Sequence, residues 1–335
     1  MRYWLSLHPD INRPIGGVKQ MHRLAEAIQA SGRQAILIQE SEDFHPGWFN
    51  SSVQTISYSK WKILRDTSLD SKQDILIVPE TFLNVIDDYS GCLPVVVFNQ
   101  NGSYSFGMPG SKVLLKPSFV ISKYQGPDIL HVLCVSKYDL DLLTSSFMLG
   151  VDKVSCIRNG IEGICKPVGN KRKQIAYMPR KNSVDALAVV ELLRAQRWCR
   201  DWDFVEISGL AHSDVISILR KSVIFLSFGH PEGFGLPVAE AMACGCAVIG
   251  YSGLGGRELF ALGEHFEVAK QVPIGDWPCF VRSVREINSL LSEDVNAFTA
   301  RLLLLSNNIK RTYSEAKMFE SVQLALSRIE LALAS

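Results

Sequence analysis

The stretch of residues 222–250 constrains the fold of this chain more than any other. It begins with the apolar run Ser222-Val-Ile-Phe-Leu-Ser-Phe228 and continues through a glycine-rich loop into a helical pattern of small residues, which ends in a second apolar run. Short β-branched and aromatic runs on either side of a helix predict a β-loop-α-β unit. Strands joined in this way run parallel, so the stretch predicts a parallel α/β sheet with a loop at the carboxyl end of one strand.

The loop in this unit has the chemistry of a ligand site. Gly233 and Gly235 let the main chain approach a ligand closely, and Pro237 suits a first helical position, where its missing N–H costs nothing. Glu232 lies in the loop and Glu240 about one turn into the helix, so their carboxylates would reach different parts of one ligand. Each carboxylate accepts two hydroxyl hydrogen bonds, which suits the vicinal diols of a sugar or a ribose. Taken singly, each is more simply read as an ordinary carboxylate, solvated on the helix or stabilising the helix dipole.

The whole segment, Glu232-Gly-Phe-Gly-Leu-Pro-Val-Ala-Glu240-Ala-Met-Ala-Cys-Gly245, resembles a known signature. It is similar to that of the retaining glycosyltransferases of the GT-B fold, most closely glycosyltransferase family 4, in which seven residues separate the two Glu. The resemblance implies an α/β protein with two Rossmann-like doubly wound domains that face a cleft, and a C-terminal helix that crosses back to the N-terminal domain. It also implies a nucleotide-sugar donor, with Glu232 at the catalytic centre. The donor-binding residues that it implies here are Glu232, Gly233, Phe234, Gly235, Leu236, Pro237 and Glu240.

Two adjacent cations, Arg180 and Lys181, follow the apolar run 175–178 directly. Cations at a strand end would neutralise a diphosphate, Arg through its planar fork and Lys as a point charge. The alternative of solvated charges is weakened, because a helix start disfavours cations unless an anion is near. In the family an Arg and a Lys, usually separated by several residues, have this role. The resemblance therefore implies that Arg180 and Lys181 bind the donor and act in catalysis, and we expect no metal ion or other cofactor.

The N-terminal half offers weaker candidates. Gly16 and Gly17 precede the helical pattern of 18–30, where free amides would suit an anion or a sugar. An ordinary tight turn would have the same sequence. The family's Gly-Gly loop at this place approaches the donor phosphates and the acceptor, so the resemblance implies donor binding by both glycines. Polar residues also end two predicted strands, at Pro79-Glu80 and at 99–102.

In many family members a His faces the sugar at about the second of these strand ends. Here the sequence reads Asn99-Gln100-Asn101-Gly102, and Asn101 or Gln100 replaces the His. Amides hydrogen-bond sugar hydroxyls but cannot act as a base, so we take Asn101 as a candidate catalytic residue without a proton-transfer role. An Asn-rich turn is the equally simple alternative.

The length of 335 residues allows two hydrophobic cores. Short apolar runs alternate with helical patterns in both halves, which is typical of parallel doubly wound sheets. We expect an N-terminal domain at 1–165 on the acceptor side, a C-terminal donor domain at 166–312, and a returning helix at 313–335. The polar, basic stretch 166–174 is the expected linker, and the pattern from Val281 to Leu333 is helical.

Two further stretches are ambiguous. Ser252-Gly-Leu-Gly-Gly-Arg-Glu258 follows an apolar run and resembles the second Gly-Gly segment of the family. Lys112 to Lys123 mixes apolar residues with lysines, which suits contact with an anionic lipid or an acceptor, or else a half-exposed strand edge with solvated lysines.

Composition excludes other function classes. The 35 basic and 34 acidic residues balance, so no nucleic-acid partner is indicated. The start is too short and too soon interrupted for a signal peptide, and no run approaches the ~18 apolar residues of a membrane span. The eight cysteines lack paired metal spacing, and we expect neither disulfides nor zinc. These features indicate a cytoplasmic protein, with peripheral contact at the inner face of the membrane left open.

The resemblance implies a retaining glycosyltransferase that uses a UDP-, GDP- or ADP-sugar. Its acceptor would be a carbohydrate or a lipid-linked molecule, as in polysaccharide or glycolipid synthesis. Two alternatives stay open at this point. One is another GT-B enzyme, such as a nucleotide-sugar epimerase or a phosphorylase. The other is a non-catalytic homologue that binds nucleotide sugars without turnover.

Overall fold

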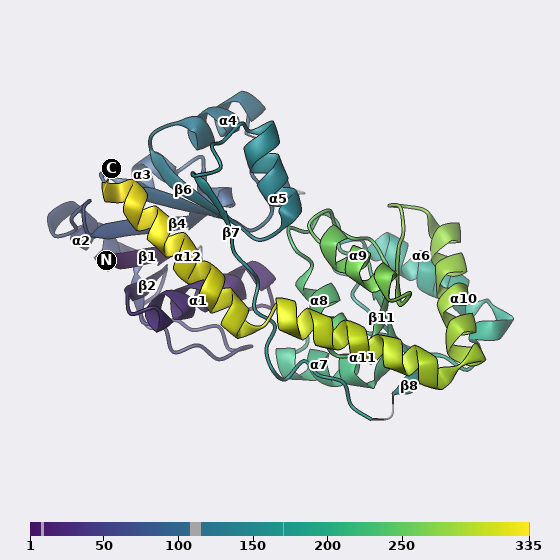
Figure 1. Cartoon of the computed structure of the whole chain (residues 1–335). Coiled ribbons are helices and arrows are strands. Elements are labelled where there is room, and N and C mark those ends of the chain that lie inside the picture. Colours follow the sequence, from purple (N-terminus) through teal and green to yellow (C-terminus); the bar gives the residue numbers. More distant parts are fainter. Residues whose placement is uncertain (8–9, 108–114, 170, 335) are drawn as a thin grey trace. The chain divides into compact units, whose positions relative to one another are not determined.

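The computed structural model of the chain describes residues 1–7, 10–107, 115–169 and 171–334. The chain forms two compact units (Figure 1). Unit 1 consists of Met1–Gly160 and Ala316–Ser335, and unit 2 of Ile161–Glu315. The chain therefore leaves unit 1 once and returns to it for its last helix.

Unit 1 is built on a seven-stranded sheet whose neighbouring strands are all parallel, in the order β3-β2-β1-β4-β5-β6-β7. The central strands are almost wholly buried apolar runs, as expected for a sheet covered on both faces. Strands β2 and β3 are added on one side of β1, and strands β4 to β7 on its other side. The order therefore reverses between β1 and β4, and the carboxyl ends of these two strands form the switch point where ligands of such sheets bind. The strands are β1 (Arg2–Ser6), β2 (Gln34–Gln39), β3 (Thr55–Ser57), β4 (Asp74–Pro79), β5 (Val95–Asn99), β6 (Ile129–Cys134) and β7 (Val154–Cys156).

The helices of unit 1 pack against this sheet and connect its strands. They are α1 (Gly16–Ala30), α2 (Tyr58–Thr67), α3 (Ile86–Ser90), α4 (Pro117–Gln125), α5 (Lys137–Asp141) and α12 (Glu315–Ala334), with short turns at Glu80–Phe82, Gly102–Tyr104 and Leu142–Ser146. In α1, Met21, Leu24 and Ile28 turn one apolar face to the core. The helix begins at Gly16, so the two glycines form its first turn and do not precede it as the sequence suggested.

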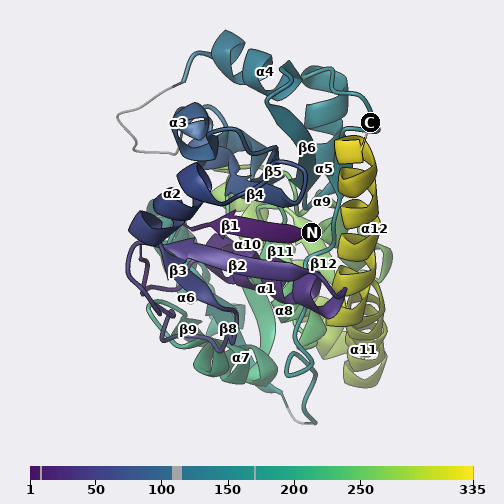
Figure 2. The ribbon, with the colours of Figure 1, turned by 90° about the vertical axis from the view of Figure 1, so that its left-hand side faces the viewer.

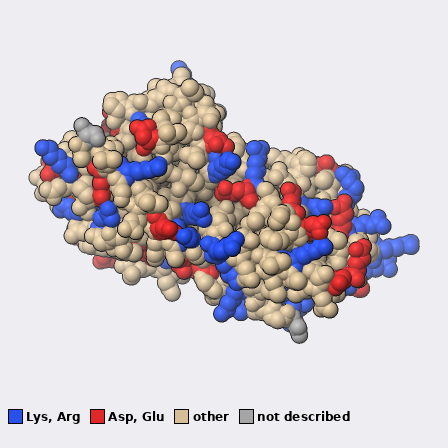
Figure 3. All heavy atoms as spheres, in the orientation of Figure 1, with Lys and Arg blue, Asp and Glu red and all other residues tan. Residues whose placement is uncertain are grey.

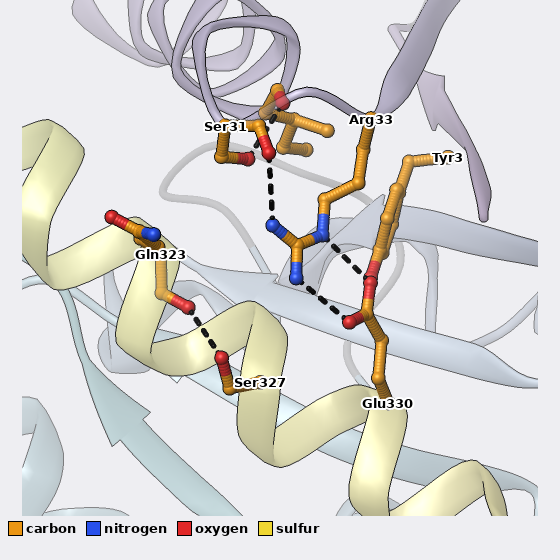
Figure 4. Close-up of polar contacts among 7 residues, drawn as sticks. Tyr3, Ser31, Arg33, Gln323, Ser327 and Glu330 are labelled. Carbon is orange, nitrogen blue, oxygen red and sulfur yellow. Dashed lines mark hydrogen bonds and ion pairs between the residues drawn. The ribbon is translucent and has the colours of Figure 1, made fainter.

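Helix α12 belongs to unit 1 although it ends the chain. Figures 1 and 2 both show it running along this unit, where Glu330 fixes it to the N-terminal segment. The Arg33 guanidinium donates to both carboxylate oxygens of Glu330 at 2.8 Å, and the Tyr3 hydroxyl donates to the same carboxylate at 2.9 Å (Figure 4). The predicted return of the last helix to the N-terminal domain is confirmed.

Unit 2 contains a five-stranded parallel sheet in the order β12-β11-β10-β8-β9. The switch point here lies between β8 and β10, whose carboxyl ends are therefore neighbours. The strands are β8 (Arg172–Tyr177), β9 (Asp203–Glu206), β10 (Ser222–Ser227), β11 (Ala247–Gly250) and β12 (Ala269–Gln271). The helices are α6 (Ser183–Arg194), α7 (His212–Lys221), α8 (Leu236–Ala243), α9 (Arg257–His265), α10 (Trp277–Glu293) and α11 (Val295–Thr312), with a short turn at Arg197–Cys199.

Two local expectations are wrong. The basic stretch expected as linker already contains the start of β8 at Arg172. In the stretch from Lys112 to Lys123, residues 112–114 lie outside the described residues, and the remainder leads into α4 and is no strand edge. Helix α4 forms because Val120 and Tyr124, four residues apart, are buried together on one face.

Acidic and basic side chains are interspersed on the face shown in Figure 3, over both units. Among the described residues, no helix combines the length and the apolar character that a membrane crossing requires.

Candidate functional site

The glycine-rich loop after β10 ends at the switch point of unit 2 and leads directly into α8. Gly235 caps the helix in the left-handed region, with φ of +89°, which glycine adopts without the strain of a side chain. Its carbonyl accepts from the amides of Val238 and Ala239, and Pro237 lies within the first two helical positions. The predicted sequence of strand, glycine loop and helix with an early proline is confirmed.

A second glycine-rich segment, 252–256, holds this loop from one side. The Glu232 amide donates to Gly253 O at 2.7 Å, and the Gly255 amide donates to Glu232 O at 3.0 Å. A Cβ at Gly255 would lie 1.8 Å from the carbonyl oxygen of Gly233. These glycines are therefore required where two backbones touch, and they fix the main chain on which Glu232 stands.

Lys181 contacts the same loop from the β8–α6 junction. Its Nζ lies 3.1 Å from Glu232 Oε1, with the two side chains 14% and 23% exposed, and it also donates to the Pro231 carbonyl. Next to it, Asn182 Nδ2 donates to the Phe228 carbonyl at 2.7 Å. The neighbouring strands β8 and β10 thus bring a cation and a carboxylate together.

Arg180 is placed differently from its neighbour. It is exposed, and no ion pair within the described residues holds its guanidinium. The sequence put both cations in one role, whereas the structure engages Lys181 with Glu232 and leaves Arg180 available to another anion.

Glu240 lies on α8, one turn from its start, and its side chain is 12% exposed. Its Oε1 accepts from His212 Nε2 at 2.9 Å, and His212 Nδ1 lies 3.5 Å from Glu162 Oε2. His212 is the first residue of α7, and Glu162 is the second residue of unit 2, just after Asn159-Gly160. Sequence reasoning missed both partners, because three separate elements contribute to the contact.

The aromatic residue of the loop supports it from within. Phe234 is buried and packs against the ring of Tyr313 at 5.1 Å between centroids, so its side chain is part of the core. Leu236 and Pro237 are half-buried. Burial, and next the nearby Lys181 charge, lower the pKa of His230, the residue that opens the loop.

In unit 1 the structure brings two predicted strand ends and the glycine turn together. The Gln100 amide nitrogen of the main chain donates to Glu80 Oε2 at 3.0 Å, and Gln100 Nε2 donates to Gly17 O at 3.3 Å. A Cβ at Gly17 would lie 3.3 Å from Gln100 Oε1, so a side chain at position 17 would crowd Gln100. Asn101 is buried and its Oδ1 caps the following turn by accepting from the Ser103 amide at 3.2 Å. Of the two amides, Gln100 is the one in contact with the glycines.

Glu80 is the buried acid beneath this turn. Burial raises its pKa to about 7, against the opposing effect of the hydrogen bond from the Gln100 amide. A carboxyl group with this pKa is partly protonated near pH 7, so small changes in pH alter its charge.

Two Asp-x-Asp sequences occur in the chain, at 139–141 and 201–203. In α5, Asp139 is buried and accepts from the Gly102 amide at 3.0 Å, whereas Asp141 is exposed. Asp201 and Asp203 are both exposed. Within residues 1–7, 10–107, 115–169 and 171–334, no group of three His, Cys, Asp or Glu side chains is arranged to hold a metal ion.

Residues 205–286, which contain the loop and α8, match the family described as glycosyl transferases group 1. The chain is also 31% identical over 200 residues to an alpha-1,6-glucosyltransferase of Actinobacillus pleuropneumoniae serotype 7 (strain AP76). That similarity covers 57% of this chain and 56% of the relative, so the chain spans little more than half the length of that relative.

Solved structures match over nearly the whole chain. The sucrose-phosphate synthase of Thermosynechococcus elongatus superposes with a TM-score of 0.71 at 14% identity, covering 100% of both chains. Anabaena HepE in complex with UDP gives 0.68 at 11% identity, covering 98% of this chain and 100% of that one. The two parallel sheets are consistent with this similarity. The chain thus has the GT-B fold, and it resembles the glycosyl transferases group 1, with the matched residues inside unit 2.

Proposed function

We propose that this chain is a retaining glycosyltransferase of the cytoplasm that transfers a sugar from a nucleotide-sugar donor to a carbohydrate or lipid-linked acceptor. The observation that carries the proposal is the pair of carboxylates on one loop-helix unit at the switch point of unit 2. Glu232 is held by Lys181 at 3.1 Å, and Glu240 stands one turn into α8. The match of residues 205–286 to glycosyl transferases group 1 supports it.

Each group has a distinct part in the proposal. Glu240 accepts hydrogen bonds from the ribose hydroxyls, and Glu232 and the amides of the loop hold the transferred sugar. The bond between the anomeric carbon and the diphosphate oxygen breaks, the oxygen of the acceptor hydroxyl group bonds to the same face of the sugar, and the proton of that hydroxyl group passes to the departing diphosphate. Negative charge grows on the departing diphosphate. Arg180 stabilises this charge more in the transition state than in the ground state, and Lys181 adds its charge there while it stays paired with Glu232.

In unit 1 we propose that Gln100, Gly16 and Gly17 contact the substrates, with Gln100 at the position where relatives have a His. Its contact with Gly17 O favours it over Asn101, whose side chain caps a turn. An amide orients a hydroxyl group but takes no proton from it, so this side chain would position the substrate only.

UDP-glucose is the first donor to test, because HepE was crystallised with UDP-glucose and the Actinobacillus relative is a glucosyltransferase. We propose further that no metal ion is needed, since the cationic pair supplies the positive charge at the diphosphate.

The test is release of UDP from UDP-glucose with and without a panel of carbohydrate and lipid-linked acceptors, with GDP- and ADP-sugars as comparison donors. We expect release that depends on an acceptor, an α-linked product by NMR coupling constants, and full activity in EDTA. A β-linked product contradicts retention, and loss of activity in EDTA that manganese restores contradicts metal independence. An epimerised nucleotide sugar without transfer would identify an epimerase, and binding without turnover a non-catalytic homologue.

A further inference from the structure

The proposed function gives Glu240 a role but none to the two side chains behind it. His212 Nε2 donates to Glu240 Oε1 at 2.9 Å, and Nδ1 of the same ring faces Glu162 Oε2 at 3.5 Å. The three side chains are 16%, 12% and 23% exposed for His212, Glu240 and Glu162 respectively, so the contact is largely shielded from water. They come from α7, α8 and the first residues of unit 2.

The hydrogen bond limits what the Glu240 carboxylate can do. A free Glu side chain samples many rotamers, and ordering it for a ligand costs conformational entropy. The bond from His212 uses one acceptor position of Oε1 and fixes the carboxylate, which leaves Oε2 and the second position of Oε1 for the ligand hydroxyls. A carboxylate ordered before the ligand arrives binds a diol more tightly than one that must be ordered on binding.

Glu162 in turn orients the ring. In the neutral ring only one nitrogen carries a proton, and the bond to Glu240 requires it on Nε2. The protonated ring donates from both nitrogens, toward Glu240 and toward Glu162. With the proton on Nε2 alone, Nδ1 is an acceptor and gains no hydrogen bond from Glu162, so Glu162 orients the ring through the doubly protonated form, in which Nδ1–H points at its carboxylate.

We propose that His212 is a positioning residue that, with Glu162 behind it, holds the Glu240 carboxylate in place to bind the ribose hydroxyls of the donor. This rests on the proposed function, in which Glu240 is the ribose ligand. The competing role is structural, because His212 begins α7 and the bond also ties α7 to α8. A structural tie would alter stability and not the recognition of one hydroxyl group.

The experiment uses the full chain and two variants of similar shape. In His212→Gln the amide nitrogen reaches about as far as Nε2 and can restore the bond to Glu240, whereas the shorter His212→Asn cannot. Affinity for UDP and for 2′-deoxy-UDP is measured by calorimetry, together with the melting temperature. The ratio of the two affinities reports how well the ribose carboxylate is placed.

We expect the wild-type chain to prefer UDP over 2′-deoxy-UDP by about 10-fold, the value of one hydrogen bond to a charged group. His212→Asn should weaken UDP binding by a similar factor and reduce the preference toward one, and His212→Gln should retain most of both. Glu162→Gln should lie between them. If His212→Asn is poorly folded, the wild type still decides: the ¹⁵N signal of His212 Nε2 should shift when UDP is added and less so with 2′-deoxy-UDP.

A UDP preference that is unchanged in His212→Asn, while Glu240→Ala abolishes it, overturns the positioning role and leaves the proposed function intact. A His212 ring signal that does not respond to UDP has the same meaning. If the wild-type chain and Glu240→Ala bind no nucleoside diphosphate at all, the proposed function itself fails, and the positioning role with it.

Discussion

The ion pair between Lys181 and Glu232 allows the sharpest test of the site geometry. At 3.1 Å and an effective dielectric constant of about 20, the Coulomb attraction is about 5 kcal/mol. Removing both groups from water and ordering the lysine chain offset most of it, because the pair is neither fully buried nor fully exposed. We therefore expect a coupling free energy of about 1–2 kcal/mol between the two side chains.

The measurement is a double-mutant cycle of Lys181→Met, Glu232→Gln and the double variant, by urea unfolding of each. The cycle cancels the separate bond from Lys181 to the Pro231 carbonyl, because Lys181→Met removes that bond whether residue 232 is Glu or Gln. The coupling should shrink in 1 M NaCl, where screening is strong. The control is Lys270→Met with Glu286→Gln, an ion pair with side chains 39% and 58% exposed, for which we expect less than about 0.5 kcal/mol. A coupling of zero at Lys181 and Glu232 would refute the inference that the lysine holds this carboxylate.

Three further predictions concern single positions. Arg180→Ala should lower kcat by about 100-fold while affinity for the bare nucleoside uridine, which lacks the diphosphate, changes little. Arg180→Lys should recover part of the rate, and steady-state kinetics with calorimetry of uridine check both expectations. Gly255→Ala should destabilise the fold by about 1–3 kcal/mol in urea unfolding, since its Cβ would meet the Gly233 carbonyl, whereas Gly163→Ala, which has open space, should not. Burial raises the pKa of Glu80 from an ordinary 4.5 to about 7, so the wild-type free energy of unfolding falls as pH rises from 4.5 to 7. Glu80→Gln lacks this titration, and its free energy of unfolding relative to wild type should rise by up to about 3 kcal/mol over the same range, measured by urea unfolding at each pH.

The sequence predicted the fold and the loop of unit 2 because their signals are local. Each signal lies in consecutive residues: an apolar run forms β10, the glycines form the loop, and Pro237 lies in the first turn of α8. The role of the segment 252–256 was less visible. Its glycines are required because they touch the backbone of another loop, and a sequence does not state which backbone lies opposite.

The partners of Glu240 show where the sequence falls short. His212 is the first residue of α7 and Glu162 follows Asn159-Gly160, and neither stretch of sequence points to a contact with the other. Their contact depends on how α7 packs beside α8 in the folded unit, which is a tertiary property. The same holds for Lys181, whose pairing with Glu232 follows from the adjacency of β8 and β10 in the sheet.

The central claim is that the nucleotide of the donor binds at the carboxyl end of β10, with its ribose on Glu240. Titration calorimetry of UDP with wild type, Glu240→Ala and the control Glu293→Ala, an exposed helix residue, tests it most directly. We predict that Glu240→Ala weakens UDP binding by about 10-fold or more, equivalent to about 1.4 kcal/mol, while Glu293→Ala binds as wild type. A folded Glu240→Ala chain that binds UDP with wild-type affinity would contradict the claim and place the nucleotide elsewhere.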